Sequence, residues 1–250
     1  MSGRQGMIGY NRTVKLRWLD ETVDLFLAGL SDADICEALR ERLKDELSVG
    51  SSAQRGSREK TITLLLKTWV RVPPPLRSLR DDAVQMVHGM RRSERLPLHW
   101  GMTMAVYPFW RVVADVTGRL FRLQGVAAPM QVQRRAKELM GEREVVARST
   151  RYVLRAFADW GVVCDSARKG EYQSAVPVVV NEPRLAAWLL ETVVVSLADG
   201  RTDFHSLVNS PCLFPFQICR ITPAQLTEIG RLEVIRHSLE ETLVRVASGR

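Results

Sequence analysis

The chain has 250 residues, of which 36 are lysine or arginine and 28 are aspartate or glutamate, giving a formal net charge of +8. A chain of this length buries a substantial core and forms one large domain or two small ones. The excess of positive charge favours a polyanionic partner, because nucleic-acid affinity comes largely from neutralising phosphates. An alternative is that the charge only keeps a basic protein soluble.

Cysteine spacing and hydropathy argue against a disulfide-rich protein and against a membrane protein. Four cysteines are spread through the sequence: Cys36, Cys164, Cys212 and Cys219. They lack the paired spacing of a zinc site and the density of a disulfide framework, so we expect buried thiols in a reducing compartment, the cytoplasm. The most apolar run, 185–198, contains Glu191 and is too short to cross a bilayer, and no apolar signal segment opens the chain. We therefore expect no membrane partner.

Residues 1–97 are predicted to form a helical N-terminal domain. Apolar residues recur at helical spacing in four segments: 14–30, 31–47, 58–69 and 76–90. Ser31 is followed by two acidic residues in the first turn and is predicted to cap the second helix. The prolines at 73–75 end the third helix. We expect residues 1–10 to be frayed and the polar stretch 48–57 to be a flexible connector.

Residues 98–181 carry, in order, the elements of a winged helix-turn-helix. Helical patterns cover three segments: 100–124, 130–140 and 149–160. Pro108 is expected to kink the first of these helices or to divide it in two. Ser149 and Thr150 are predicted to cap the third helix with their hydroxyl groups, and Gly161 is predicted to end it in a left-handed conformation. The third helix is then in the position of a recognition helix.

A β-hairpin is predicted directly after this recognition helix. The valine-rich runs 162–164 and 176–180 are strand-like and are expected to pair with each other. The polar tip between them, 165–171, contains Arg168 and Lys169. The hairpin is therefore predicted to be a wing with a basic tip.

Residues 182–250 are predicted to form a C-terminal helical and hairpin region. A buried helix begins at Pro183, and a short helix follows Thr222, which is a predicted N-cap. The runs 232–235 and 242–246 are strand-like. A helix followed by a hairpin indicates a second, degenerate winged-helix-like unit. The fold class expected for the whole chain is mainly α, with small β-hairpins.

The candidate DNA-binding residues lie mainly on the predicted recognition helix, the helix before it and the wing. At about 100° per residue, Arg148, Arg151 and Arg155 fall in one narrow sector, and the apolar Val153 and Phe157 fall on the opposite side. Arginine suits forked contacts with phosphates and guanine edges, and a recognition helix fits the major groove of double-stranded DNA. The complete set is Arg134, Arg135, Lys137, Arg148, Ser149, Arg151, Tyr152, Arg155, Arg168 and Lys169.

Each part of this set has an expected role and a plainer alternative. The cations at 134–137 are expected to hold the DNA backbone beside the groove, and the wing tip is expected to reach an adjacent phosphate or the minor groove. Tyr152 either stacks on DNA or contacts a phosphate, or it is a boundary aromatic residue of the core. Arg148, Arg151 and Arg155, which we call the arginine row, are alternatively a solvated helix face that is neutralised by local ion pairs with Asp159.

The sequence offers little support for a catalytic or metal site. Its histidines are scattered: His88, His99, His205 and His237. No two of them have the helical spacing of a metal-binding pair. The acidic pairs at 81–82 and 240–241 lack the rest of a nuclease centre, and no glycine-rich phosphate loop or nucleophile elbow is present. We expect a protein that is not an enzyme and uses no cofactor or metal.

Three stretches of the chain together resemble one protein family. They are the N-terminal helices, the segment from Arg148-Ser149-Thr150-Arg151 to Trp160-Gly161-Val162-Val163, and the late stretch Ser210-Pro211-Cys212-Leu213-Phe214-Pro215-Phe216. In these stretches the chain resembles the helical BrxA-type accessory proteins of bacterial phage-exclusion (BREX) systems, although it is long for such a protein. The resemblance implies a cytoplasmic, non-enzymatic, DNA-binding component that works beside a methyltransferase and other antiviral defence proteins.

The sequence therefore predicts a double-stranded DNA-binding accessory subunit of an anti-phage defence or DNA-processing assembly, with other protein subunits as partners. Two alternatives stay open at this point. A winged-helix transcription regulator would form a dimer and prefer an inverted-repeat site. A protein-interaction scaffold would keep the fold but would have lost DNA binding, because fold alone does not set function.

Overall fold

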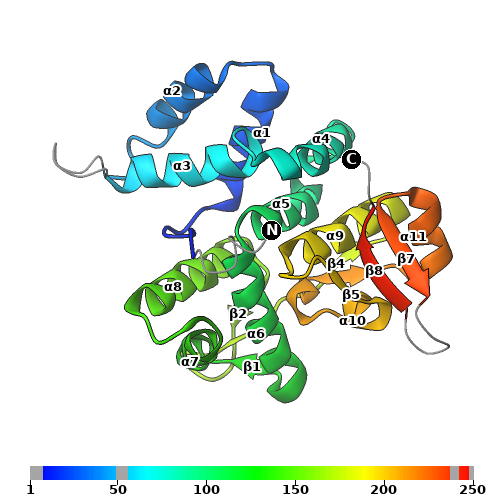
Figure 1. The fold of residues 1–250 in the computed structure, drawn as a ribbon. Coiled ribbons are helices and arrows are strands. Elements are labelled where there is room, and N and C mark those ends of the chain that lie inside the picture. The colour runs from blue at the N-terminus through cyan, green and yellow to red at the C-terminus, as the bar shows by residue number, and fades with distance from the viewer. Residues whose placement is uncertain (1–7, 49–55, 237–241, 248–250) are drawn as a thin grey trace.

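The fold is mainly α, as the sequence predicts (Figure 1). The computed structural model describes residues 8–48, 56–236 and 242–247, and these ranges contain eleven α-helices and eight short strands. Most of the predicted frayed start and connector, at 1–7 and 49–55, lies outside the described residues. The prediction of a frayed start is wrong for Ile8 and Tyr10, because both side chains are buried in the core.

The N-terminal region is built from four helices, and their boundaries follow the local signals. They are α1 (Leu16–Leu27), α2 (Asp32–Arg42), α3 (Ser57–Trp69) and α4 (Arg77–Val87). The Ser31 hydroxyl accepts a hydrogen bond from the Asp34 N–H over 3.2 Å, which confirms the predicted N-cap of α2. The 3₁₀ turn Pro74–Leu76 precedes α4, and a second one, Arg92–Glu94, precedes the next helix.

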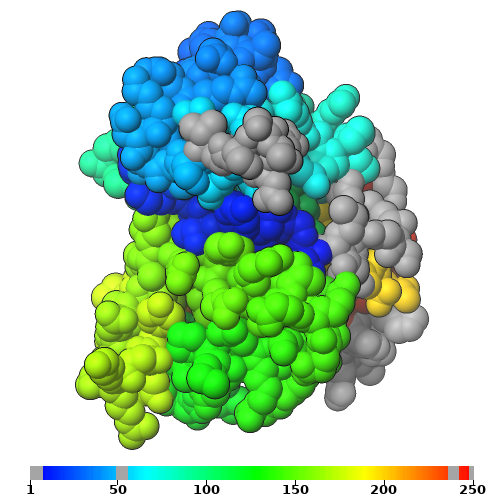
Figure 2. Space-filling view, turned by 90° about the vertical axis from the view of Figure 1, so that its left-hand side faces the viewer, coloured from blue at the N-terminus to red at the C-terminus, as the bar shows by residue number. Residues whose placement is uncertain are grey.

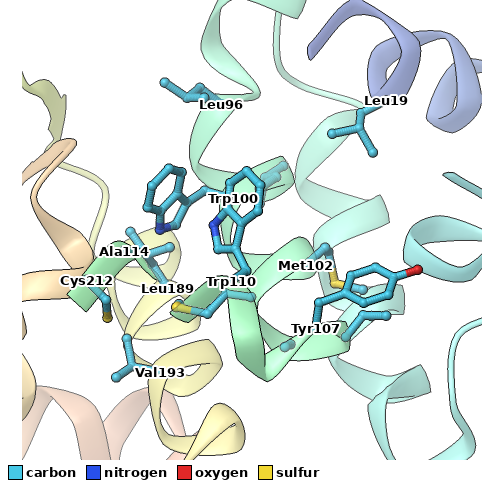
Figure 3. Packing of buried hydrophobic residues seen from close by; sticks show 14 of the residues in the cluster. Leu19, Leu96, Trp100, Met102, Tyr107, Trp110, Ala114, Leu189, Val193 and Cys212 are labelled. Atoms are coloured by element: carbon cyan, nitrogen blue, oxygen red, sulfur yellow. The ribbon is translucent and has the colours of Figure 1, made fainter. Parts of the chain in front are cut away.

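Helix α5 (Leu96–Val106) lies at the centre of the molecule, and every one of its residues is buried. It packs between the N-terminal helices and α9 (Pro183–Ser196) (Figure 1). Pro108 starts a separate helix, α6 (Pro108–Gln124), so the stretch 100–124 is divided in two. Trp100 of α5 and Trp110 of α6 meet edge to face, with ring centroids 5.3 Å apart (Figure 3). The buried apolar cluster extends from Ile8 to Val244, across both of the expected domain boundaries, 97/98 and 181/182.

The middle of the chain forms a unit of three helices and a small antiparallel sheet, which we call the first unit. It consists of α6, β1 (Val126–Ala127), α7 (Pro129–Met140), α8 (Glu144–Asp159), β2 (Val163–Asp165) and β3 (Tyr172–Ser174). Strand β3 lies in the middle of the sheet, which has the order β1-β3-β2. Gly161 follows α8 with a φ of 69°, so its predicted left-handed conformation is confirmed.

One boundary and one strand pairing in this part of the chain differ from those predicted. The third helix begins at Glu144 rather than Ser149, because Val145 and Val146 extend its inward-facing side by a further turn. The partner of β2 is β3, not the run 176–180. Within that run, β4 (Val178–Val180) instead pairs in parallel with the distant strand β6 (Phe216–Ile218).

The C-terminal part repeats the order of elements of the first unit, and we call it the second unit. It consists of α9, β5 (Arg201–Asp203), α10 (Phe204–Val208), α11 (Pro223–Ile229), β7 (Leu232–Arg236) and β8 (Thr242–Val246). Its sheet has the order β5-β8-β7, in which the last strand is again central. The turn Pro211–Leu213 and β6 are inserted between α10 and α11. The predicted cap of α11 is confirmed, because the Thr222 hydroxyl accepts from the Gln225 N–H.

Close backbone packing and a buried ion pair hold these parts together. At Gly118 in α6, a Cβ would overlap the carbonyl oxygen of Pro211, so only glycine allows this contact between the two units. Arg231, which is 3% exposed, pairs with Glu191 of α9 over 2.6 Å and with Asp82 of α4. A lone buried guanidinium would be costly, so these two carboxylates are its necessary partners.

Candidate nucleic-acid interface

Helix α8 has the two faces that its sequence predicts. Val146, Val153 and Phe157 are 0% exposed, and Trp160, just after the helix, is 4% exposed. The Phe157 ring stacks on Trp100 and meets Trp110 edge to face, with centroid distances of 5.0 Å in both cases. The inner face of α8 is therefore fixed in the aromatic core, and its opposite face is free to meet a ligand.

The outer face of α8 carries Arg148, Arg151 and Arg155, all of them exposed. Arg151 lies 3.5 Å from the exposed carboxylate of Glu144, an ion pair of small energetic weight. Among the residues that the structure describes, no carboxylate forms an ion pair with the other two arginines. The expected ion pairs of Asp159 with the row are absent from the described residues, and the Asp159 carboxylate accepts a hydrogen bond from the Leu16 N–H at the start of α1. A solvated helix face stays the alternative for this surface.

Ser149 does not belong to this surface. It is 1% exposed and lies in the middle of α8, so its hydroxyl cannot meet a ligand at the outer face, and the prediction that it contacts DNA is wrong. Its predicted capping role, shared with Thr150, is also wrong, because the helix begins five residues earlier. The Thr150 hydroxyl instead donates to the Val146 carbonyl one turn back.

Tyr152 lies at the edge of the outer face, half-buried against the N-terminal segment. The guanidinium carbon of Arg12 lies 5.8 Å from the centre of the Tyr152 ring. Two further contacts hold this segment on α8: the Asp159 bond to the Leu16 N–H, at 3.0 Å, and a bond from Trp160 Nε1 to the Val14 carbonyl, at 2.9 Å. Arg12 is not among the predicted residues, because a single arginine in an irregular stretch gives no periodic signal.

The cations of α7 are largely neutralised by neighbouring carboxylates. Arg134 and Arg135 share Glu138, at 3.8 and 2.8 Å, and Lys137 lies 3.2 Å from Glu142. Arg134 and Arg135 are exposed and Lys137 is half-buried, and such solvated surface pairs are weak, so a phosphate can compete for these cations. Their contribution to the positive potential is nevertheless smaller than that of the arginine row on α8.

The hairpin tip after β2 places two more cations on the surface. Arg168 and Lys169 are both exposed. The Ser166 hydroxyl accepts from the Arg168 N–H over 3.0 Å, and Gly170, with a φ of 83°, turns the chain back towards β3. Figure 2 shows this hairpin, in yellow-green, beside the green helices on one face of the molecule. The hairpin therefore lies beside the helices of the first unit.

The third helix of the second unit has a different surface. The sequence of α11 is PAQLTEI, and its exposed positions include Gln225, Thr227 and Glu228 but no cation. The nearest following arginine, Arg231, is buried in its ion pairs. The two units thus share an order of elements, and only the first has a basic third helix.

Among the described residues, the histidines and cysteines form no metal-binding cluster at this surface. His99 is completely buried, where its Nδ1 accepts from Trp69 Nε1 at 3.1 Å and its Nε2 lies 3.0 Å from Asp20. Burial lowers the pKa of His99, and the neighbouring Asp20 opposes this shift. His237 and the acidic pair 240–241 lie outside the described residues. The prediction of buried thiols is confirmed for Cys212 and wrong for Cys164, which is exposed on β2.

No helix in the described part of the chain combines the length and the apolar character needed to span a bilayer. Comparisons of the chain with protein-family models, with curated proteins and with solved structures found no match. The surface of the first unit is therefore the feature from which a function can be inferred.

Proposed function

We propose that the first unit is a winged helix-turn-helix that binds double-stranded DNA through the outer face of α8. The arginine row carries this proposal: three exposed cations on a helix whose opposite face is anchored in the core. Further support comes from the order α6, β1, α7, α8, β2, β3, which matches the order of elements in a winged helix, and from the basic tip after β2. In this proposal α8 enters the major groove and the tip contacts the backbone.

We further propose that the protein is a non-catalytic accessory subunit of a cytoplasmic anti-phage defence or DNA-processing assembly. The resemblance to BrxA-type proteins supports this setting. The second unit is proposed to be a degenerate winged helix with a structural role, because its third helix lacks cations and its Arg231 is tied to α4 and α9. Other subunits of the assembly are the expected protein partners.

Duplex binding measured over a series of salt concentrations tests the proposal. Replacing Arg148, Arg151 and Arg155 together by alanine should weaken binding to a random-sequence duplex at least about tenfold and lower the salt slope by up to about three. The matched control removes three exposed arginines from other elements: Arg42, Arg77 and Arg201. The control should bind like the unmodified protein, and circular dichroism should show that both variants are folded.

The same salt series separates the alternatives. A steep salt slope with little sequence preference supports the accessory subunit. Strong selection of an inverted repeat by a dimer would instead identify a transcription regulator. An unmodified protein that binds no duplex at low salt would identify a protein-interaction scaffold, and equal affinities for the two triple variants would overturn the role of α8.

A further inference from the structure

The N-terminal segment 8–15, which we call the strap, is fixed in the aromatic core and at the C-terminal end of α8, beside the edge of its outer face. At its beginning, Tyr10 is 1% exposed and meets Tyr107 and Trp110 edge to face, with centroid distances of 5.6 and 5.2 Å. At its end, Trp160 donates to the Val14 carbonyl, and Asp159 accepts from the Leu16 N–H. Both ends of the strap are therefore held by the same aromatic core that fixes α8. Figure 2 shows this dark-blue segment directly above the green helices.

Arg12 lies between these two anchor points and is carried to the edge of the arginine row. Its guanidinium lies over the ring of Tyr152. Around the helix axis, Tyr152 lies about 40° from Arg148, and the three arginines of the row together span about 60°, so Tyr152 is at the edge of the row. Nε of Arg12 also donates to the Ser57 hydroxyl of α3 over 3.2 Å. Arg12 thus bridges α8 and α3 and prolongs the positive surface of α8 towards the N-terminal helices.

The polar partners of Arg12 are neutral. They are the Ser57 hydroxyl, the Asn11 carbonyl and the Tyr152 ring. The carboxylates of neighbouring elements have other partners: Glu46 pairs with Lys15 and Arg17, Glu59 pairs with Arg40, and Asp159 caps α1. Among the described residues, no acidic side chain forms an ion pair with Arg12. Its charge is consequently available to an anion.

We propose that Arg12 binds a backbone phosphate of the DNA that α8 engages, so that the interface extends from the wing across α8 to the strap. This inference depends on the proposed function. A duplex has phosphates on both sides of the groove that a recognition helix occupies, and a cation beside the row is placed for a phosphate rather than for a base edge. The anchored strap and the Tyr152 ring hold the guanidinium in place before DNA arrives, which reduces the entropy lost on binding.

Salt-dependent duplex binding of Arg12→Ala tests this assignment. The loss of one phosphate contact should weaken binding about three- to tenfold on every duplex sequence and lower the salt slope by about one. Arg12→Lys should keep most of that slope, because the charge is retained. The matched control is Arg17→Ala, since Arg17 lies just after the strap, in the first turn of α1, is exposed and already pairs with Glu46. The control should leave affinity and slope unchanged.

Photocrosslinking gives a second, independent measurement. In a Cys164→Ser background, which removes the exposed thiol of β2, Arg12→Cys is labelled with azidophenacyl bromide and irradiated with duplex. Efficient protein–DNA crosslinking is expected for Arg12→Cys, and none above background is expected for the same label at Arg17→Cys.

The outcomes distinguish the two proposals. The role of α8 stands if the unmodified protein binds DNA and the triple α8 variant does not. The role of Arg12 is overturned, in that case, if Arg12→Ala retains the full salt slope and labelled Arg12→Cys does not crosslink. The role of Arg12 would also be overturned if Arg12→Ala had a lower urea midpoint of unfolding but an unchanged salt slope of duplex binding, because Arg12 would then make a purely structural contact. An unmodified protein that binds no duplex would overturn both proposals.

Discussion

The carboxylate of Asp159, at the end of α8, accepts a hydrogen bond from the backbone N–H of Leu16, at the start of α1, over 3.0 Å. Lys15 is the N-cap residue of α1, and its side chain accepts no capping hydrogen bond. Asp159, which is distant in the sequence, therefore provides the acceptor that a local N-cap normally supplies. The contact joins the candidate DNA-binding helix to the N-terminal helices.

Replacing Asp159 by alanine should therefore destabilise the protein by about 1 kcal/mol, the usual cost of losing an N-cap. Asp159→Asn keeps an acceptor oxygen and should cost less. Urea unfolding of both variants measures the difference. Duplex affinity should not fall in Asp159→Ala, because the change removes a negative charge; a large loss of affinity would show that the carboxylate orients α8.

Phe157→Ala should lower the free energy of unfolding by about 3–5 kcal/mol, because the ring is fully buried between Trp100 and Trp110. Arg155→Ala, on the exposed face of the same helix, should change it by less than about 0.5 kcal/mol. Denaturant titration compares the two. A loss below about 1 kcal/mol for Phe157→Ala would contradict the packing of α8 described above.

Acidification should destabilise the protein through His99. Burial lowers the pKa of His99 in the folded state, so the unfolded chain takes up a proton at a higher pH than the folded protein. The stability contributed by neutral His99 is complete above its ordinary pKa of about 6.5 and is lost as the pH falls below that value. Urea midpoints between neutral pH and pH 5 should therefore fall more steeply for the unmodified protein than for His99→Gln. The exposed His88 serves as control, since His88→Gln should leave the steep slope in place.

Replacing Arg168 and Lys169 together by alanine should weaken binding by a similar factor on all duplex sequences and lower the salt slope by up to about two. Arg134→Ala combined with Arg135→Ala removes the same charge from α7 but should have the smaller effect, because both residues share Glu138. Binding isotherms at several salt concentrations make the comparison. Isotherms of the wing variant that overlay those of the unmodified protein would exclude the hairpin tip from the interface.

Local signals in the sequence predicted the helices well and the long-range pairings poorly. The caps at Ser31 and Thr222 and the turn at Gly161 depend on neighbouring residues alone, and all three are confirmed. The predicted start of α8 is wrong because the hydroxyl residues Ser149 and Thr150 are typical of an N-cap but lie inside the helix. A hydroxyl at the start of an apolar pattern and one within it look alike in a sequence.

The strand partner of the run 176–180 could not be predicted from neighbouring residues. Its valines favour a strand, but the partner β6 lies far along the chain, and the pairing is parallel. Arg12 was missed for a related reason: its position beside α8 depends on tertiary contacts of Val14 and Leu16 with residues 159–160. The arginine row, in contrast, depends on helical periodicity alone, and its exposure was predicted correctly.

The complete burial of α5 has a consequence for the synthesis of this protein on the ribosome. Helix α9, which covers one side of α5, is finished only after about ninety further residues have been translated. During that interval the nascent chain exposes an apolar helix that includes Trp100, Met102 and Met104. Such a segment is prone to aggregation and is a natural substrate for chaperones that bind emerging chains. The yield of soluble protein in a cell should therefore depend on the speed of translation between α5 and α9 as well as on the stability of the finished fold.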